Sequence, residues 1–259
     1  MAQVFGEPGR NAAEESFKRT KGLLIAAFCA IATLGFLGGY AIAAILLVRM
    51  VSLGWLLMMT APLIFLMWVV GKWTTTKIDA IDRQRMSWRK GAVGEALVAR
   101  TLESLPGEFV VINDVSKRFG NIDHVVIGPT GVYVIDSKNW KGTVKADGRG
   151  ELLVNGQPPS KPAIKTILAS LMDFQSKLKV LTEKDYFVRG LLVFPMAYVE
   201  ANFGSTGQIH CLRDERLVDY LGDQTFARKL SVTDVELIKT ATLQMAGMDA
   251  RFMSPGASG

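Results

Sequence analysis

Two long apolar runs dominate the first third of the chain. Residues 22–71 contain one charged residue, Arg49, which separates an apolar run at 23–48 from a second run at 51–70. Each run is long enough to cross a bilayer as a helix, because about 20 apolar residues span the hydrocarbon core. The pattern predicts a transmembrane helical hairpin over residues 22–71. The alternative is a helix pair buried in a soluble core, where charge-free runs of this length are rare.

Basic residues flank the two runs on their outer sides. Lys18, Arg19 and Lys21 precede the first run, and six lysines and arginines lie within residues 72–90, whereas the turn carries only Arg49. Because positively charged flanks stay in the cytoplasm, this bias predicts a protein integral to the cytoplasmic (inner) membrane, with two spans and both termini cytoplasmic. Its lipid bilayer is then one partner of the chain. Residues 72–90 are predicted to be a basic connector that lies along the surface.

Beyond residue 90, apolar residues that recur at helical spacing predict a folded domain. Apolar residues at four-residue steps predict an amphipathic helix at 91–105, and a second apolar stripe predicts a helix from Pro162 to Leu181. Two shorter helices are expected at 214–221 and 233–246, the latter opened by a capping box of Thr233 and Glu236.

Strands are predicted between these helices. Buried strands are expected at 109–115, 186–194 and 208–212, and hairpins at 122–138 and 142–156. Helices that alternate with such strands predict an α/β domain at residues 91–250, built on a mixed sheet flanked by helices. Residues 1–21 are expected to be a loosely ordered polar segment, and residues 251–259 a disordered tail.

Charge and composition narrow the classes of function. The net charge is +6, but residues 91–259 hold 19 basic and 19 acidic residues, so the surplus lies entirely in the membrane flanks and turn. The basic balance is therefore no argument for nucleic-acid binding. With two cysteines and two histidines far apart, the chain lacks the ligand spacing of a usual zinc site and a disulfide framework.

The hairpin at 122–138, IDHVVIGPTGVYVIDSK, places charged residues in apolar strands. If residues 128–131 form the loop, Ile127 pairs with Val132 and Asp123 lies opposite Asp136. Two opposed carboxylates repel each other, and a divalent cation such as Mg²⁺ or Mn²⁺ is the natural compensation. Lys138 lies two residues beyond Asp136, hence on the same face, where it can stabilise negative charge developing on a phosphate.

Two alternatives stay open at this point. The charged residues can be ordinary strand-end charges, with Asp136 and Lys138 paired through water. A loop of odd length would place Asp123 and Asp136 on opposite faces. His124 is expected to point away from Asp123, and Trp140 to be a packing residue rather than a base-stacking one.

Three segments together resemble the nuclease-related domain (NERD) family, which belongs to the restriction-endonuclease-like superfamily with the PD-(D/E)XK signature. The resemblance covers about residues 88–215 and is carried by GAVGEALVARTLESL, NIDHVVIGPTGVYVIDSKNWKG and RGLLVF. It implies a restriction-endonuclease-like mixed sheet, with Asp123 and Asp136 as the two signature acids, Lys138 as the signature lysine and Glu95 as the helix glutamate. Asp123, Asp136 and Glu95 are the implied metal ligands.

The sequence departs from the family pattern at two positions. The second acid is usually Glu, whereas Asp136 is one methylene shorter, and Lys165 stands about where the family often has Gln. Without the resemblance, Glu95 would be an ordinary solvated glutamate at the edge of an apolar stripe.

The combined expectation is a membrane-anchored, Mg²⁺- or Mn²⁺-dependent nuclease that hydrolyses phosphodiester bonds in DNA or RNA. The alternative is a non-catalytic module with a nuclease-like fold, which binds nucleic acid or a protein partner at the inner membrane face. A fold alone does not decide between them.

Overall fold

A computed structural model describes residues 1–8, 27–36, 38–43, 45–46, 58, 65, 68–69, 72, 86, 89–116, 121–200, 208–223 and 229–247. The chain divides into two compact units. One comprises Met1–Ala12 and Lys90–Gly259, and the other comprises Ala13–Arg89. All strands among the described residues belong to the first unit, which therefore carries the predicted α/β domain.

The prediction of a two-span integral membrane protein is contradicted. Within the part of the chain that the structure describes, no helix combines the length and the apolar character needed to cross a membrane. Most of residues 22–71, most of the predicted connector at 72–90, and the tail at 251–259 lie outside the described residues.

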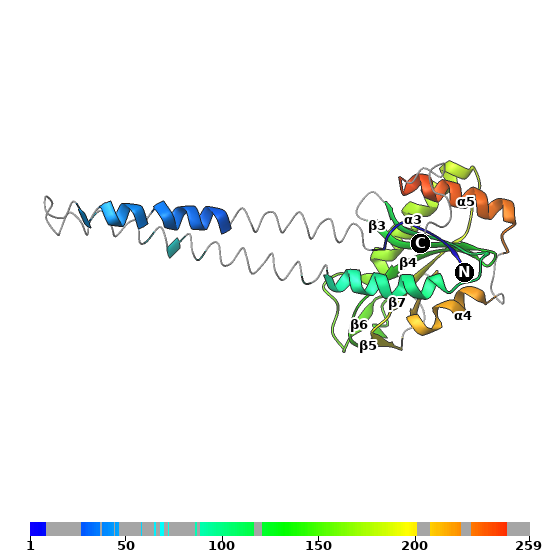
Figure 1. Cartoon of the computed structure of the whole chain (residues 1–259). Coiled ribbons are helices and arrows are strands. Elements are labelled where there is room, and N and C mark those ends of the chain that lie inside the picture. Colours follow the sequence, from blue (N-terminus) through cyan, green and yellow to red (C-terminus); the bar gives the residue numbers. More distant parts are fainter. Residues whose placement is uncertain are drawn as a thin grey trace. The chain divides into compact units, whose positions relative to one another are not determined.

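The main sheet of the first unit has six strands and is mixed, as predicted (Figure 1). Its order is β1-β2-β3-β4-β7-β9. Neighbouring strands are antiparallel from β2 to β4 and parallel elsewhere. The strands are β1 (Gln3–Phe5), β2 (Val110–Ser116), β3 (Asn121–Gly128), β4 (Gly131–Ser137), β7 (Val188–Phe194) and β9 (Ile209–Arg213).

The edge strand β1 comes from the segment that was predicted to be loosely ordered. Gln3 to Phe5 pair with Val110 to Ile112 of β2 in parallel register. The side chain of Asn113 reinforces this contact, because its Nδ2 donates a hydrogen bond to the carbonyl oxygen of Gly6 at 3.0 Å.

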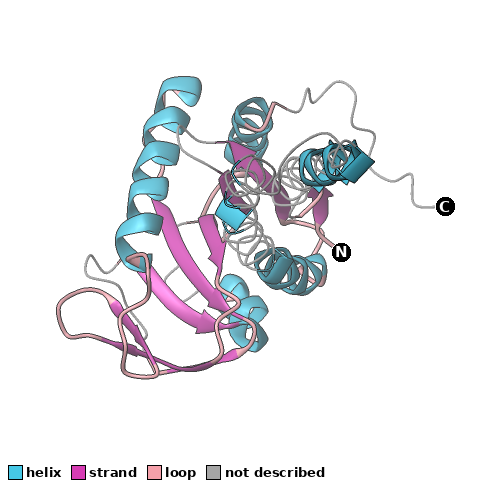
Figure 2. Ribbon diagram, turned by 90° about the vertical axis from the view of Figure 1, so that its left-hand side faces the viewer, coloured by secondary structure: helices cyan, strands magenta, loops and turns pink. Residues whose placement is uncertain are grey.

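A smaller sheet has the order β6-β5-β8. The predicted second hairpin forms its antiparallel part, β5 (Gly142–Ala146) and β6 (Leu152–Val154), which Figure 2 shows with its turns in pink. Strand β8 (Ala197–Val199) pairs with β5 in parallel and was not predicted.

Helices cover both faces of the main sheet. On one face, α3 (Ala163–Thr182) and α5 (Val232–Met245) contribute Phe174 and Ile238 to a core with the β-strands. On the other face, a helix over residues 89–103 contributes Val98 and Leu102, and α4 (Leu217–Gly222) packs beside it. Figure 1 shows α5 above the sheet and α4 below it.

The structure corrects two details of the predicted helices. Val93, expected in the apolar stripe of the helix at 89–103, is 55% exposed. The N-cap of α5 is Ser231, whose hydroxyl oxygen accepts from the backbone N–H of Asp234 at 3.1 Å, so Thr233 is not the capping residue. A short 3-10 helix, η2 (Asp214–Arg216), precedes α4.

Candidate active site

The hairpin of β3 and β4 has the predicted register. Ile127 pairs with Val132, and Val125 with Val134. The pairing ends at His124 and Ile135, so Asp123 and Asp136 occupy the next row, where the ladder has opened. Because both acids stand at the same end of adjacent strands, the hairpin brings their side chains to one point of the sheet.

The side chain of Asp123 bonds to β4 where the backbone ladder stops. Its Oδ2 accepts hydrogen bonds from the backbone N–H of Ser137 at 2.7 Å and from the Ser137 hydroxyl at 3.0 Å. Burial raises the pKa of Asp123 well above its ordinary value, and the negative charges of Asp136 and Glu95 raise it further. Lys138 and the Ser137 N–H act in the opposite direction.

Asp136 and Lys138 form a close ion pair at the end of β4. The Nζ of Lys138 lies 2.5 Å from Oδ2 of Asp136, and the two side chains are 25% and 22% exposed. Burial, the largest single influence, lowers the pKa of Lys138, but the charges of Asp136, Asp123 and Glu95 together outweigh it. The net pKa of Lys138 is raised, so the ammonium is charged at neutral pH.

Glu95 reaches this group from the helix over residues 89–103. Burial raises the pKa of Glu95, and the negative charges of Asp114 and Asp136 raise it further, while Lys138 opposes them. Glu95, Asp123, Asp136 and Lys138 are thus close enough for their charges to act on one another.

Sequence reasoning missed Asp114 as a neighbour of this group. Asp114 lies in β2 between the rows in which Asn113 pairs with His124 and Val115 with Ile122, so it stands opposite Asp123. Its φ of 60° lies in the left-handed region, and its Oδ1 accepts from Asn121 Nδ2 at 2.5 Å. An acid within the apolar strand FVVINDV was the available signal.

The carboxylates of this group have the donor chemistry of a divalent-cation site. Carboxylate oxygens are the ligands that Mg²⁺ and Mn²⁺ prefer, so the chemistry of Asp123, Asp136 and Glu95 fits. Among the described residues, however, no three carboxylate, imidazole or thiol side chains are already arranged to hold a metal ion. In this structure the cation beside Asp136 is the ammonium of Lys138.

Comparison with known proteins finds a similarity for the part of the chain that holds this group. Residues 90–195 match the sequence profile described as the nuclease-related domain. Residues 90–195 are therefore similar to the nuclease-related domain (NERD) family. Glu95, Asp123, Asp136 and Lys138 all lie within the matched residues.

The chain also matches part of one curated protein. The chain is 34% identical over 73 residues to an uncharacterized protein of Bacillus anthracis, across 26% of this chain and 34% of that protein. The matched part thus spans about a third of the relative's length. No solved structure matches the chain with significance.

Two further residues within the matched segment, His124 and Trp140, have structural roles. His124 is fully buried, and its Nδ1 lies 2.7 Å from Oδ1 of Asn113. Burial lowers the pKa of His124 to about 4, so this imidazole is neutral at physiological pH and holds Asn113 in the core. The ring of Trp140 packs on Phe194, with centroids 5.4 Å apart, which agrees with the predicted packing role.

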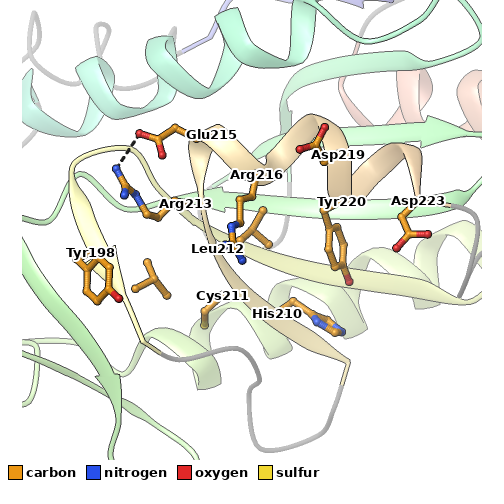
Figure 3. A pocket seen from close by; sticks show the side chains of 11 residues that line it. Tyr198, His210, Cys211, Leu212, Arg213, Glu215, Arg216, Asp219, Tyr220 and Asp223 are labelled. Atoms are coloured by element: carbon orange, nitrogen blue, oxygen red, sulfur yellow. Dashed lines mark hydrogen bonds and ion pairs between the residues drawn. The ribbon is translucent and has the colours of Figure 1, made fainter.

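A cavity of about 850 Å³ lies beside β9 and α4 (Figure 3). Its lining includes Arg213 and Arg216, but also Glu215, Asp219 and Asp223. Arg213 is already paired with Glu215 at 2.8 Å. With more acids than cations in the lining, the cavity offers no attraction for a polyanion, and none of the four predicted site residues lines it.

Proposed function

We propose that the NERD-like domain hydrolyses phosphodiester bonds of DNA or RNA with the help of Mg²⁺ or Mn²⁺. The proposal is supported by the position of Asp123 and Asp136 in one row at the open end of the β3–β4 hairpin, with Lys138 paired to Asp136 and with the negative charge of Glu95 acting on Asp123. Asp123, Asp136 and Glu95 would hold the cation. When bound, such a cation supplies an activated water and neutralises charge on the scissile phosphate.

The protein residues have distinct roles in this proposal. The Ser137 N–H and hydroxyl fix one oxygen of Asp123, which orients the carboxylate. Lys138 stays charged among the acids and is partly exposed, so its ammonium can stabilise negative charge that develops on a phosphate. Glu95 reaches the same point from a helix, a rigid support that favours precise placement.

A second candidate is a non-catalytic module that binds nucleic acid or a protein partner. The observation that favours it is the ion pair between Lys138 and Asp136, which already neutralises one acid without a metal. The balanced charge of residues 91–259 is a further point against strong electrostatic attraction to a nucleic-acid substrate.

Cleavage assays distinguish the two candidates. The full-length protein is incubated with single- and double-stranded DNA and RNA in Mg²⁺, Mn²⁺ or EDTA. Full length matters because β1 comes from the first residues, which a fragment starting near residue 88 would lack. Asp123→Asn should abolish a metal-dependent product. Asp185→Asn is the matched control, because Asp185 is exposed and pairs with Lys179 outside the site.

The outcomes separate the candidates cleanly. Metal-dependent cleavage that survives Asp185→Asn but not Asp123→Asn supports the nuclease. Retention of labelled oligonucleotide on the protein, with no product under any metal condition, would instead support the binding module.

A further inference from the structure

Gly94 and Asn139 form a contact between the helix that holds Glu95 and the segment that follows β4 and Lys138. Gly94 precedes Glu95 in the helix over residues 89–103, and Asn139 follows Lys138 directly after β4. A β-carbon added at Gly94 would lie 2.8 Å from Cβ of Asn139 and 3.5 Å from its Cα and Cγ. The first separation is shorter than packed carbon atoms tolerate, so a side chain at position 94 would push the two segments apart.

A hydrogen bond strengthens the same contact. Nδ2 of Asn139 donates to the carbonyl oxygen of Lys90 at 2.7 Å. This carbonyl lies one helical turn before Gly94, because an α-helix bonds residue i to residue i−4. The side chain of Asn139 therefore contacts the helix at both Lys90 and Gly94, which lie one turn apart.

Asn139 is itself held on the main sheet by its two neighbours. The N–H of Lys138 donates to the carbonyl of Val193 in β7 at 2.8 Å. The N–H of Trp140 donates to the carbonyl of Lys138, also at 2.8 Å, and the ring of Trp140 packs on Phe194. The segment that touches Gly94 is thus fixed to the sheet, and the helix is placed relative to it.

We propose that Gly94 and Asn139 are positioning residues, which set the distance of Glu95 from the Asp136–Lys138 pair through this close contact. The proposal rests on the proposed nuclease function and adds the element that assembles its site. Glu95 comes from a helix on one face of the sheet, so its approach to the strand ends depends on how closely the helix packs there. A misplacement of about 1 Å in such a group can cost about 10²-fold in rate.

A size-swap experiment on the full-length protein tests this proposal. Gly94→Ala adds the clashing β-carbon, and Asn139→Gly removes the atoms that it meets. In the double variant the Cβ and Cγ that the added methyl group would meet are gone, and Cα of residue 139 lies at an ordinary 3.5 Å. Gly91→Ala is the matched control, because its β-carbon would meet only Oε1 of Glu95, at 4.0 Å, in the same helix.

The variants are compared by cleavage kinetics with the substrate and metal that the wild type uses. We expect Gly94→Ala to lower kcat by about 10²-fold, with KM nearly unchanged because the lost interaction acts in the transition state. The double variant should recover at least about 10-fold of that loss. Gly91→Ala should retain the wild-type kcat.

Thermal unfolding provides a readout that does not depend on catalysis. Overpacking should lower the melting temperature of Gly94→Ala by about 2–12 °C, and the double variant should regain part of it. Gly91→Ala should raise the melting temperature by about 1–4 °C, because alanine favours the helix.

Two kinetic results would overturn the proposal. One is a wild-type kcat in Gly94→Ala, and the other is a double variant no faster than Gly94→Ala. If the wild type cleaves no substrate, the nuclease proposal fails by itself, and a crystal structure of Gly94→Ala then judges the positioning role. A Glu95 carboxylate displaced from Asp136 supports that role, and an unchanged placement refutes it.

Discussion

Replacing Asp123 by Asn should make the metal-free protein more stable at neutral pH. Asp123 faces two acids, Asp136 and Glu95, and one cation, Lys138. Two unit charges about 5 Å apart interact by about 3 kcal/mol at an effective dielectric constant of about 20. The attraction of Lys138 offsets one of the two repulsions that Asp123 feels from Asp136 and Glu95. The net interaction of the Asp123 charge is therefore about one repulsion of this size.

The two hydrogen bonds from Ser137 should survive this substitution, because the side-chain oxygen of Asn accepts as a carboxylate oxygen does. We therefore expect Asp123→Asn to gain about 1–3 kcal/mol in the free energy of unfolding in EDTA. Urea unfolding of the full-length protein at pH 7.5 measures this difference, with Asp185→Asn as the control for loss of a surface acid.

The pH dependence has a defined sign. The pKa of Asp123 is raised in the folded state, so its protonated form stabilises the fold fully below the ordinary value of 3.8. This contribution is lost as the pH rises through the higher folded pKa. The advantage of Asp123→Asn should therefore grow as the pH rises through the folded pKa of Asp123 and stay constant above it.

Mg²⁺ should reverse the order of stability. A ligand present at 100 times its dissociation constant adds about 2.7 kcal/mol to the wild type, and Asp123→Asn should gain much less. An Asp123→Asn protein that is less stable than the wild type in EDTA at neutral pH would refute this reasoning. Asp123 would then be mainly the structural acceptor for Ser137.

Three further predictions concern the charged group and the edges of the fold. Lys138→Met should lower kcat by about 10²–10³-fold in the cleavage assay while the protein stays folded by circular dichroism, because the aliphatic stem is kept and the charge is lost. Deleting residues 1–8 should cost about 2–4 kcal/mol in urea unfolding, through loss of buried Phe5 and the Asn113–Gly6 hydrogen bond, whereas Val4→Thr at a 40% exposed position should cost far less. Ser231→Ala should cost about 1 kcal/mol in the same measurement and Thr233→Ala almost nothing, and equal effects would contradict the assigned cap of α5.

The hairpin shows what the sequence could predict. The turn at residues 128–131 and the strict apolar pattern fixed the register of Val125 with Val134, and with it the row of Asp123 and Asp136. Local chemistry alone carries this information, because a slip of one residue would reverse every side chain.

Other elements depend on contacts that no local pattern reveals. Strand β1 has three residues and no alternation, and it pairs with a strand far away in the chain. The position of Asp114 beside Glu95 required the packing of the helix on the sheet. The membrane prediction rested on the length of the apolar runs alone. The described residues contain no helix that is long and apolar enough to cross a membrane.

The pairing of β1 with β2 has a consequence for the order of folding. Gly6 and Asn113 are 107 residues apart in the chain, so their contact closes a very long loop. Closing such a loop costs more entropy than forming the hairpins around it, and β1 should therefore add last, after the rest of the main sheet. On the ribosome, the first residues must wait for β2 to emerge. Until β1 pairs with it, the outer edge of β2 is an unpaired strand, open to association with another copy of the chain, and the pairing of β1 closes that route to aggregation.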